Sequence, residues 1–323
     1  MLYMKRFINN IKGGNTLLTE LREQINKYFV GKEDVVTKAL ICLLARGHLL
    51  IEDVPGVGKT KLAKTLAESI DASFGRIQFT PDTLPGDVLG VSVFNMASRE
   101  FEFHEGPIMN QILLADEINR TSPKTQAAML EAMAEGKVSI DGRDIEIPKP
   151  FMVIATQNPT EFIGTFPLPE AQTDRFLMRI TVGYPSREAE ILMAQKHITG
   201  ELEEKISPVC TMADIAKMQD EAASVHMSRA VLEYIGNILE QTRKSESFVV
   251  GASPRAGLAL VDAARANAYV EGRDFVKPDD VKAVALSVLE HRLKLTSEAR
   301  IKAENPEKLL WSLILAAKIP MEA

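Results

Sequence analysis

The sequence predicts an α/β domain, in which a parallel sheet has helices on both faces and two inserted hairpins, followed by an all-α domain. Over roughly the first half of the 323 residues, short apolar runs alternate with helical patterns. This alternation is typical of parallel strands joined by crossover helices. Two pairs of strand-like segments interrupt it. Beyond residue 185 the strand-like runs cease and only helical patterns follow.

The elements of the first domain are justified by apolar spacing. Leucines and isoleucines recur at helical spacing after a polar tail over residues 1–15, and short apolar runs mark buried strands. In chain order we expect a helix over 17–25, a helix over 35–46, a strand over 48–52, a helix from residue 61, strands over 76–79 and 112–115, a helix over 123–134 and a strand over 151–156. The α/β core is then expected over residues 16–185.

Two hairpins and a helical region complete the organisation. The first hairpin is expected over 91–94 and 102–104. The second is expected over 137–140 and 145–147, around Asp141-Gly142, which favours a tight two-residue turn. The second domain, residues 186–323, is expected to hold helices over 187–197, 213–223, 228–243, 254–270, 278–293 and 306–318.

Composition and charge exclude several classes of protein. The chain is 46% hydrophobic and 25% charged, which is ordinary for a globular protein and not for a disordered one. Its 38 basic and 44 acidic residues give a net charge of −6, which argues against a protein that coats nucleic acid. Cys42 and Cys210 form no metal or disulfide pattern, and the sequence shows no signal peptide or membrane-spanning apolar run. We therefore expect a cytoplasmic protein.

The segment from Glu52 to Thr60, EDVPGVGKT, carries the strongest chemical signal. A strand ends, the backbone turns through glycines and a helix begins, so amide N–H groups and the helix dipole point at one spot that suits a phosphate. Lys59 is expected to reach the β- and γ-phosphates of a nucleotide, and the Thr60 hydroxyl to ligate Mg²⁺. One position departs from the GxxxxGK[ST] pattern, because Asp53 stands where glycine is usual.

Polar residues after two further strands supply the parts that hydrolysis needs. Asp116 and Glu117 follow the run ILLA, and Asn158 follows FMVIAT. Asp116 is expected to hold the Mg²⁺ shell, and Glu117 to orient or deprotonate the attacking water. Asn158 is expected to contact the γ-phosphate or the water.

Two arginines are candidates for stabilising the transferring phosphoryl group, whose equatorial oxygens attract a cation. Arg175, in EAQTDRF, follows the fourth predicted strand and is expected to project toward a neighbouring subunit. Arg255, in SPRA, opens a helix of the second domain and is expected to fold over bound nucleotide.

With these residues in place, the sequence resembles an AAA+ ATPase, and within that class the MoxR family. The resemblance runs from about residue 17 to residue 293 and includes the two hairpins, which match the helix-2 and pre-sensor-1 insertions of the family. Its most specific stretches are RIQFTPDTLPGDVLG, LLADEINRTSPKTQAAMLEAMAEGKVSIDG, ATQNPTEFIGTFPLPEAQTDRFLM and SPRAGLALVDAARANAYVEGRDFVKPDDV.

The resemblance implies a role for each candidate residue. Asp116 and Glu117 become Walker B, Asn158 sensor 1, Arg175 the arginine finger and Arg255 sensor 2. Arg120 is a second candidate for the trans-acting arginine. The remaining implied nucleotide contacts are Val30 and Gly31 against the adenine and, around Walker A, Asp53, Val54, Pro55, Gly56, Val57, Gly58, Lys59, Thr60 and Lys61.

The resemblance also implies a biochemical activity and partners. Members of the family bind and hydrolyse ATP with Mg²⁺, commonly as hexameric rings with nucleotide between subunits. They act as chaperone-like activators of client proteins, often with partners that carry a von Willebrand factor A domain. We therefore expect a homo-oligomeric ATPase whose second domain is a lid.

Two other interpretations stay open. One is a nucleotide-gated assembly protein that binds ATP and hydrolyses it negligibly. The other is a motor subunit like a helicase or a magnesium chelatase. A nucleic-acid motor is disfavoured because the hairpins are poor in basic residues, with only Arg99 in the first and Lys137 and Arg143 in the second.

Overall fold

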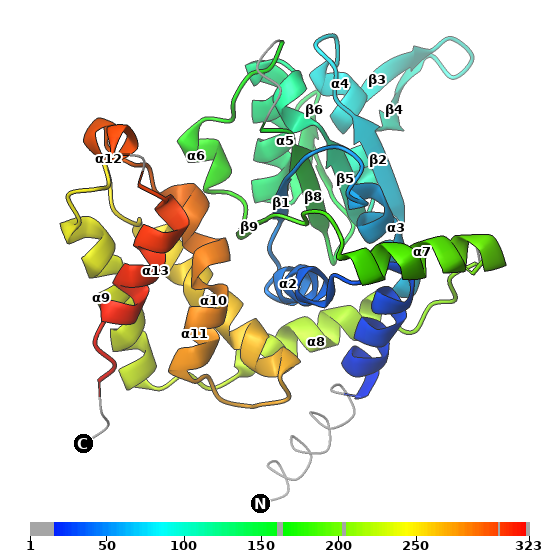
Figure 1. The fold of residues 1–323 in the computed structure, drawn as a ribbon. Coiled ribbons are helices and arrows are strands. Elements are labelled where there is room, and N and C mark those ends of the chain that lie inside the picture. The colour runs from blue at the N-terminus through cyan, green and yellow to red at the C-terminus, as the bar shows by residue number, and fades with distance from the viewer. Residues whose placement is uncertain (1–15, 160–163, 202–204, 303, 321–323) are drawn as a thin grey trace, which may run out of the picture.

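The computed structural model describes residues 16–159, 164–201, 205–302 and 304–320, and the expected N-terminal tail lies outside them. Figure 1 shows a sheet with its helices beside a group of helices from the C-terminal part of the chain. The predicted fold class, a parallel α/β domain followed by an all-α lid, is confirmed.

The central sheet has five parallel strands in the order β2-β5-β8-β1-β9. β1 lies between β8 and β9, although β2 and β5 follow it in the sequence. The strands are β1 (Leu49–Glu52), β2 (Phe74–Gln78), β5 (Ile112–Asp116), β8 (Met152–Gln157) and β9 (Met178–Ile180). The sequence analysis did not predict β9, because three residues are too few to show a strand pattern.

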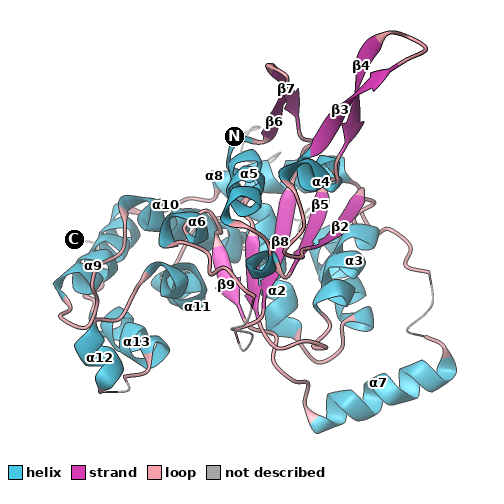
Figure 2. Cartoon of the chain, turned by 90° about the horizontal axis from the view of Figure 1, so that it is seen from above, coloured by secondary structure: helices cyan, strands magenta, loops and turns pink. Residues whose placement is uncertain are grey.

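Helices cover both faces of this sheet (Figures 1 and 2). Leu49 and Ile51 face one hydrophobic cluster, and Leu50, between them, faces another, as expected for a strand buried on both sides. The first cluster includes the helix over residues 16–28, α2 (Glu33–Leu44) and α3 (Lys59–Ser69). The second includes α4 (Pro85–Leu89), η1 (Pro107–Met109) and α5 (Pro123–Glu135).

The two predicted hairpins are present and project on the side of the sheet that α4 and α5 cover (Figure 2). The first pairs β3 (Gly90–Asn95) with β4 (Glu100–Glu105). The second pairs β6 (Lys137–Ile140) with β7 (Arg143–Glu146). Asp141 and Gly142 form its turn with φ of 51° and 74°, as the mirror-image two-residue turn requires.

From residue 186 on, the described chain contains helices and two isolated β-bridges. Most of these helices begin where a Ser, Thr or Asn side chain accepts a backbone N–H, which satisfies a donor that the first turn leaves open. They are α7 (Arg187–Thr199), α8 (Met212–Ser224), α9 (Arg229–Lys244), α10 (Pro254–Val270), α11 (Pro278–Leu289), α12 (Ser297–Ile301) and α13 (Pro306–Ala316).

The end of α11 differs from the expectation. A helix to residue 293 was predicted, but α11 ends at Leu289 and a 3₁₀ turn, η3 (Glu290–Arg292), follows. The side chains of this turn contact the sheet domain, and these contacts favour a local geometry that differs from a continued α-helix.

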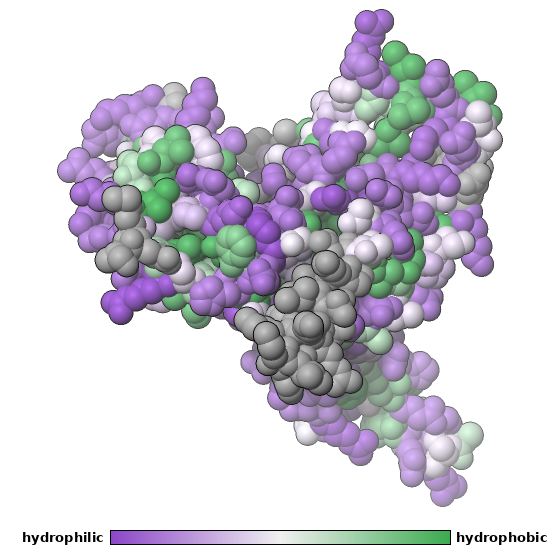
Figure 3. All heavy atoms as spheres, turned by 90° about the horizontal axis from the view of Figure 1, so that it is seen from below, coloured by the Kyte–Doolittle hydropathy of each residue, from purple (hydrophilic) through white to green (hydrophobic). Residues whose placement is uncertain are grey.

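Helix α7 projects from the molecule and carries hydrophobic side chains that are exposed to solvent. Ile191 is 50% exposed and Ile198 84% exposed, and Figure 3 shows apolar residues gathered along this helix. Ala189, near its start, is buried. None of the described helices combines the length and the apolar character needed to cross a membrane.

His48 connects the start of β1 to two neighbouring elements. Its Nδ1 accepts a hydrogen bond from the Val153 amide at 3.0 Å, and its Nε2 donates to the Met133 carbonyl at 3.2 Å. Burial lowers the pKa of His48 from 6.5 to about 4. The Val153 hydrogen bond acts in the same direction, because protonated Nδ1 no longer accepts it.

We expect His48 to make the folded state sensitive to acid. In the unfolded chain His48 binds a proton below pH about 6.5, whereas in the folded chain it does so only below pH about 4. Protonation therefore favours the unfolded state, and the free energy of unfolding decreases as the pH falls between these values. The free energy of unfolding should drop by about 2 kcal/mol more between pH 7.5 and 5 than in a His48→Gln variant. Urea unfolding of both proteins at the two pH values measures this difference, and equal losses would contradict the prediction.

Candidate functional site

The predicted phosphate loop runs from β1 into α3 across the carboxyl edge of the sheet, where ligands of α/β proteins bind. Gly56 and Gly58 have φ of 85° and 91°, which L side chains rarely adopt. At Gly56 nothing lies within 4 Å of an added Cβ, so the loop is open there. With the amino end of α3 behind it, this open turn can present amide N–H groups to an anion.

Asp53, the departure from the usual loop pattern, is explained by its contacts. Its Oδ2 accepts hydrogen bonds from the amides of Val182 and Gly183, both at 2.6 Å, and its Oδ1 accepts from Val54 at 2.8 Å. The residue is 8% exposed and has no positive φ that would call for glycine. Its carboxylate thus fastens the first turn of the loop to the segment after β9.

Lys59 lies between the loop and the predicted acidic residues. Its Nζ donates to the Asp53 carbonyl at 2.8 Å. Partial burial lowers the pKa of Lys59, while the negative charges of Asp116, Asp53 and Glu117 act in the opposite direction. The structure therefore brings Lys59, Asp116 and Glu117 into one electrostatic site.

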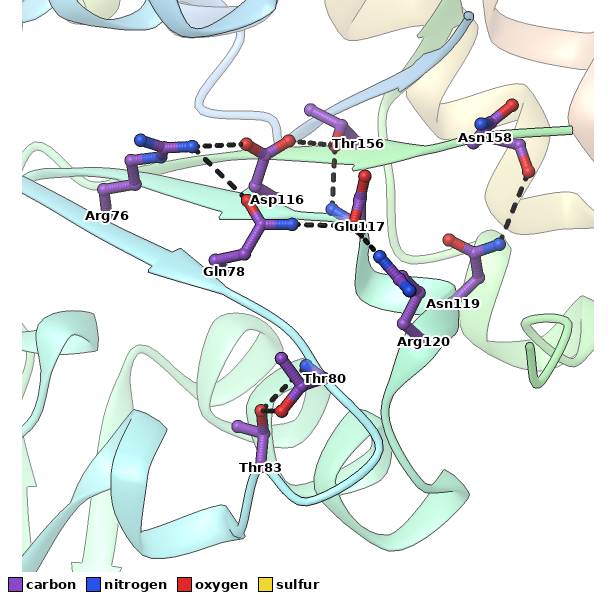
Figure 4. Close-up of polar contacts among 10 residues, drawn as sticks. All are labelled: Arg76, Gln78, Thr80, Thr83, Asp116, Glu117, Asn119, Arg120, Thr156 and Asn158. Atoms are coloured by element: carbon purple, nitrogen blue, oxygen red, sulfur yellow. Dashed lines mark hydrogen bonds and ion pairs between the residues drawn. The ribbon is translucent and has the colours of Figure 1, made fainter. Parts of the chain in front are cut away.

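Asp116 ends β5, and both of its carboxylate oxygens are engaged (Figure 4). Oδ1 accepts from the Thr156 hydroxyl at 2.6 Å, and Oδ2 forms an ion pair with Arg76 at 3.0 Å. The same Thr156 oxygen accepts the Glu117 amide at 2.9 Å. Thr156 on β8 thus holds the side chain of Asp116 and the backbone of Glu117.

Glu117 follows β5 in the left-handed region, with φ of 57°, which is uncommon and strained for a non-glycine residue. Its Oε2 accepts from the Gln78 amide at 2.7 Å and from Arg120 at 2.9 Å (Figure 4). Arg120 ends η2 (Ile118–Arg120). The carboxylate that is predicted to activate water is therefore held by β2 on one side and by its own chain's Arg120 on the other.

Asn158 follows β8 and is 5% exposed. Its carbonyl accepts a weak hydrogen bond from Asn119 at 3.5 Å (Figure 4). Because β8 separates β1 from β5, this residue lies at the same edge of the sheet as the phosphate loop and the acidic pair.

The other predicted arginines contact parts of the chain other than the acidic pair. Arg175 follows α6 (Glu170–Thr173) and donates to the Leu130 carbonyl of α5 at 2.7 Å. Arg255 opens α10 and lies near Arg292, whose pKa its charge helps to lower in addition to burial. Arg292 in turn binds the segment around Arg175. The structure thus groups Arg255 with the chain around Arg175, while Arg120 contacts the acidic pair.

A pocket lies beside the loop, next to the residues that are predicted to contact adenine. Val30 lines it, as do Val57 and Lys61 from the loop and α3. Gly31 has φ of 74°, and a Cβ added there would lie 2.5 Å from Ala189 of α7. A glycine at this position therefore allows the chain to pack closely against α7. The other lining residues are Tyr28, Phe29, Lys32, Gly56, Gly58, Pro185 and Met193. An apolar slot beside a phosphate loop suits a nucleotide base.

Sequence reasoning missed Arg76, Gln78 and Thr156. A signal for the first two exists, because residues two apart on a strand share a face. Gln78 pairs with Asp116 in the register of β2 on β5, so alternating polar residues there lie beside the acids. The strand order that makes this placement useful is not visible in the sequence.

The donor set fits Mg²⁺ held together with a phosphate ligand. Asp116 and Thr60 supply the carboxylate and hydroxyl oxygens that this ion prefers, and Mg²⁺ usually takes few protein ligands and completes its shell with phosphates and water. Among the residues that the structure describes, no group of three or more His, Cys, Asp or Glu side chains is placed to hold a metal ion. Asp116 ends β5 and Thr60 lies in the first turn of α3, so a site with these two protein ligands would leave the rest of the shell to phosphate and water.

Comparisons with known proteins agree with this geometry. Residues 48–178 match the family described as "ATPase family associated with various cellular activities (AAA)", and residues 240–310 match the AAA lid domain. The chain is 47% identical over 306 residues to the uncharacterized protein YeaC of Bacillus subtilis, covering 95% of this chain and 96% of that protein. It is 40% identical over 306 residues to Chaperone MoxR1 of Mycobacterium tuberculosis, covering 92% and 81%. The crystal structure of a candidate ATPase from Cytophaga hutchinsonii superposes with a TM-score of 0.93 at 33% identity, covering 99% of this chain and all of that one.

Proposed function

Because the chain belongs to the MoxR family of AAA+ ATPases, we propose that it is a Mg²⁺-dependent ATP hydrolase that remodels or activates client proteins. The observation that carries the proposal is the electrostatic site of Lys59, Asp116 and Glu117 at one edge of the sheet. A nucleotide-binding member of this family needs these three groups together for hydrolysis.

In this mechanism each part of the site has one task. The loop amides and Lys59 bind the β- and γ-phosphates, and Glu117 orients or deprotonates the attacking water. Thr60 and Asp116 would hold Mg²⁺, which would supply positive charge to neutralise the phosphates when bound. Asn158 positions the water or the γ-phosphate, and Arg175 acts on the nucleotide of a neighbouring subunit.

We propose a homo-oligomeric ring, most simply a hexamer, with nucleotide between cytoplasmic subunits. Exposed Ile191, Leu192 and Ile198 on α7 support an assembly contact, since apolar residues gathered on one projecting helix favour burial (Figure 3). We propose that residues 16–185 form the nucleotide-binding core and residues 186–323 the lid.

The client-contacting element in this proposal is the β3–β4 hairpin, which projects from the sheet (Figure 2). Met96 is 83% exposed and Phe101 65% exposed near its tip, and Phe101 packs edge-on against Phe94. Rigid exposed aromatics of this kind bind protein surfaces well. The client, which we propose to be accompanied by a von Willebrand factor A domain partner, is a protein and not a nucleic acid.

One observation favours the second interpretation, a nucleotide-gated assembly protein with negligible hydrolysis. Glu117 Oε2 accepts hydrogen bonds from both Gln78 and Arg120, so this oxygen can act on a water only after at least one of these contacts loosens. In the proposed function this release accompanies assembly or client binding. In the second interpretation it never occurs.

The concentration dependence of ATP turnover tests the proposal. If each site is completed by a neighbour, turnover per subunit should rise with protein concentration and level off where light scattering shows that assembly is complete. A Mg²⁺-free sample containing chelator is the control and should show none. A rate near zero at every concentration, despite complete assembly, would favour the nucleotide-gated interpretation.

A further inference from the structure

The junction between lid and core is built around η3, and it surrounds Arg175. Arg292, whose side chain is 4% exposed, donates from Nε to Asp174 Oδ1 at 2.6 Å. Its Nη2 donates to the carbonyls of Phe176 at 2.7 Å and Asp174 at 3.3 Å, and its Nη1 to that of Leu177 at 3.1 Å. One lid side chain therefore binds the backbone on both sides of Arg175.

Two other residues of η3 strengthen this junction. His291 contacts the Phe176 carbonyl through Nε2 at 3.1 Å, and burial lowers its pKa well below the usual value, so the ring is neutral and Nε2–H is the donor. Glu290 pairs with Arg179 at 3.1 Å. Arg179 also pairs with Glu52 at 2.7 Å, directly before the phosphate loop. The junction thus touches the chain that carries the candidate trans-acting arginine and the strand that carries the loop.

Arg175 itself is held both through its side chain and through its backbone. Its Nη1 contacts the Leu130 carbonyl, while the backbone before and after it is fixed from the lid. A buried guanidinium that satisfies several carbonyls is rigid, because losing any of these bonds leaves a buried polar group unpaired. Arg292 therefore fixes the backbone from which the Arg175 side chain extends.

We propose that Arg292 is a positioning residue for Arg175: the lid of one subunit places the arginine that completes the ATPase site of the next. The inference rests on the proposed function, in which Arg175 acts in trans. It makes the contact between lid and core in one subunit a determinant of hydrolysis in its neighbour.

Mixed assemblies test this inference with donor and acceptor subunits. The acceptor, Arg175→Ala, keeps its own loop and Glu117 but cannot serve a neighbour. The donor, Glu117→Gln, cannot hydrolyse but offers an intact Arg175. Each alone should be inactive, and mixing them should restore ATP turnover.

Adding Arg292→Gln to the donor should reduce the restored turnover by about tenfold to a hundredfold, because a displacement of about 1 Å costs that much. Arg292→Gln as acceptor, with Glu117→Gln as donor, should recover turnover as Arg175→Ala does. A residue that only stabilised its own subunit would fail in this second mixture. Binding of a fluorescent ATP analogue to Arg292→Gln should stay within about twofold of the unchanged chain.

The matched control is Arg229→Gln in the donor, which alters an exposed lid arginine on α9 that pairs with Glu233. This donor should restore turnover as fully as the donor without Arg229→Gln.

If Arg292→Gln does not fold, Asp174→Asn decides the question, since it removes the charged partner of Arg292 and keeps the backbone carbonyls. In the donor, Asp174→Asn should also reduce the restored turnover. Fully restored turnover with the Arg292 or Asp174 variant as donor would overturn this inference alone. Failure of the reference pair to restore turnover would overturn the trans role of Arg175 and this inference with it.

Discussion

A chain carrying Glu117→Gln is expected to bind ATP as tightly as the unchanged protein and to hydrolyse it about a thousandfold more slowly, within the range that general-base groups contribute. The amide keeps the size of the side chain and its acceptor oxygen, so the contacts to Gln78 and Arg120 can persist. What is lost is the negative charge that draws a proton from water. The backbone of residue 117 is fixed independently by Thr156, so the substitution should leave the loop undisturbed.

Phosphate release at saturating Mg-ATP measures the loss of hydrolysis, and binding of a fluorescent ATP analogue measures the affinity that should be retained. Glu131→Gln is the control, because it makes the same chemical change on the exposed side of α5. Its turnover should match that of the unchanged chain. Hydrolysis by Glu117→Gln within tenfold of that rate would assign water activation to another group.

Much of the fold followed from local pattern. Glycine turns, apolar runs and helical spacing are short-range signals, and they located the loop before Lys59 and the acids after β5. The Asp141-Gly142 turn was also predictable, since its two positive φ values favour these residue types. The roles of these residues remain predictions, but the edge of the sheet on which they meet follows from the parallel strand order.

What the sequence could not show are contacts that depend on tertiary pairing. The link between Arg76 and Asp116 requires β2 to lie beside β5, and the link between Arg292 and Asp174 requires the lid to dock just before β9. A solvated arginine and a buried one look alike in a sequence. Burial is decided by which surfaces pack, so the part of the site that joins core to lid emerged only from the structure.

Lys59→Ala is expected to lose ATP binding and, with it, all measurable turnover. Removing Nζ takes away the cation that would meet the β- and γ-phosphates, and it removes one of the positive charges that offset Asp116 and Glu117. Folding should survive, because burial already disfavours the ammonium: its pKa is lowered despite three nearby acids. We expect the free energy of unfolding to change by less than about 1 kcal/mol.

Lys64→Ala is the matched control, since it removes another lysine of α3 that forms an exposed ion pair with Glu68. It should bind and hydrolyse ATP normally. Read together, the lysine and glutamate variants separate the two interpretations of the chain. For an ATPase, Lys59→Ala loses binding and turnover, whereas Glu117→Gln loses turnover only. For a nucleotide-gated assembly protein, Lys59→Ala loses nucleotide-dependent assembly, whereas Glu117→Gln changes nothing, because the carboxylate held by Gln78 and Arg120 then has no reaction to serve.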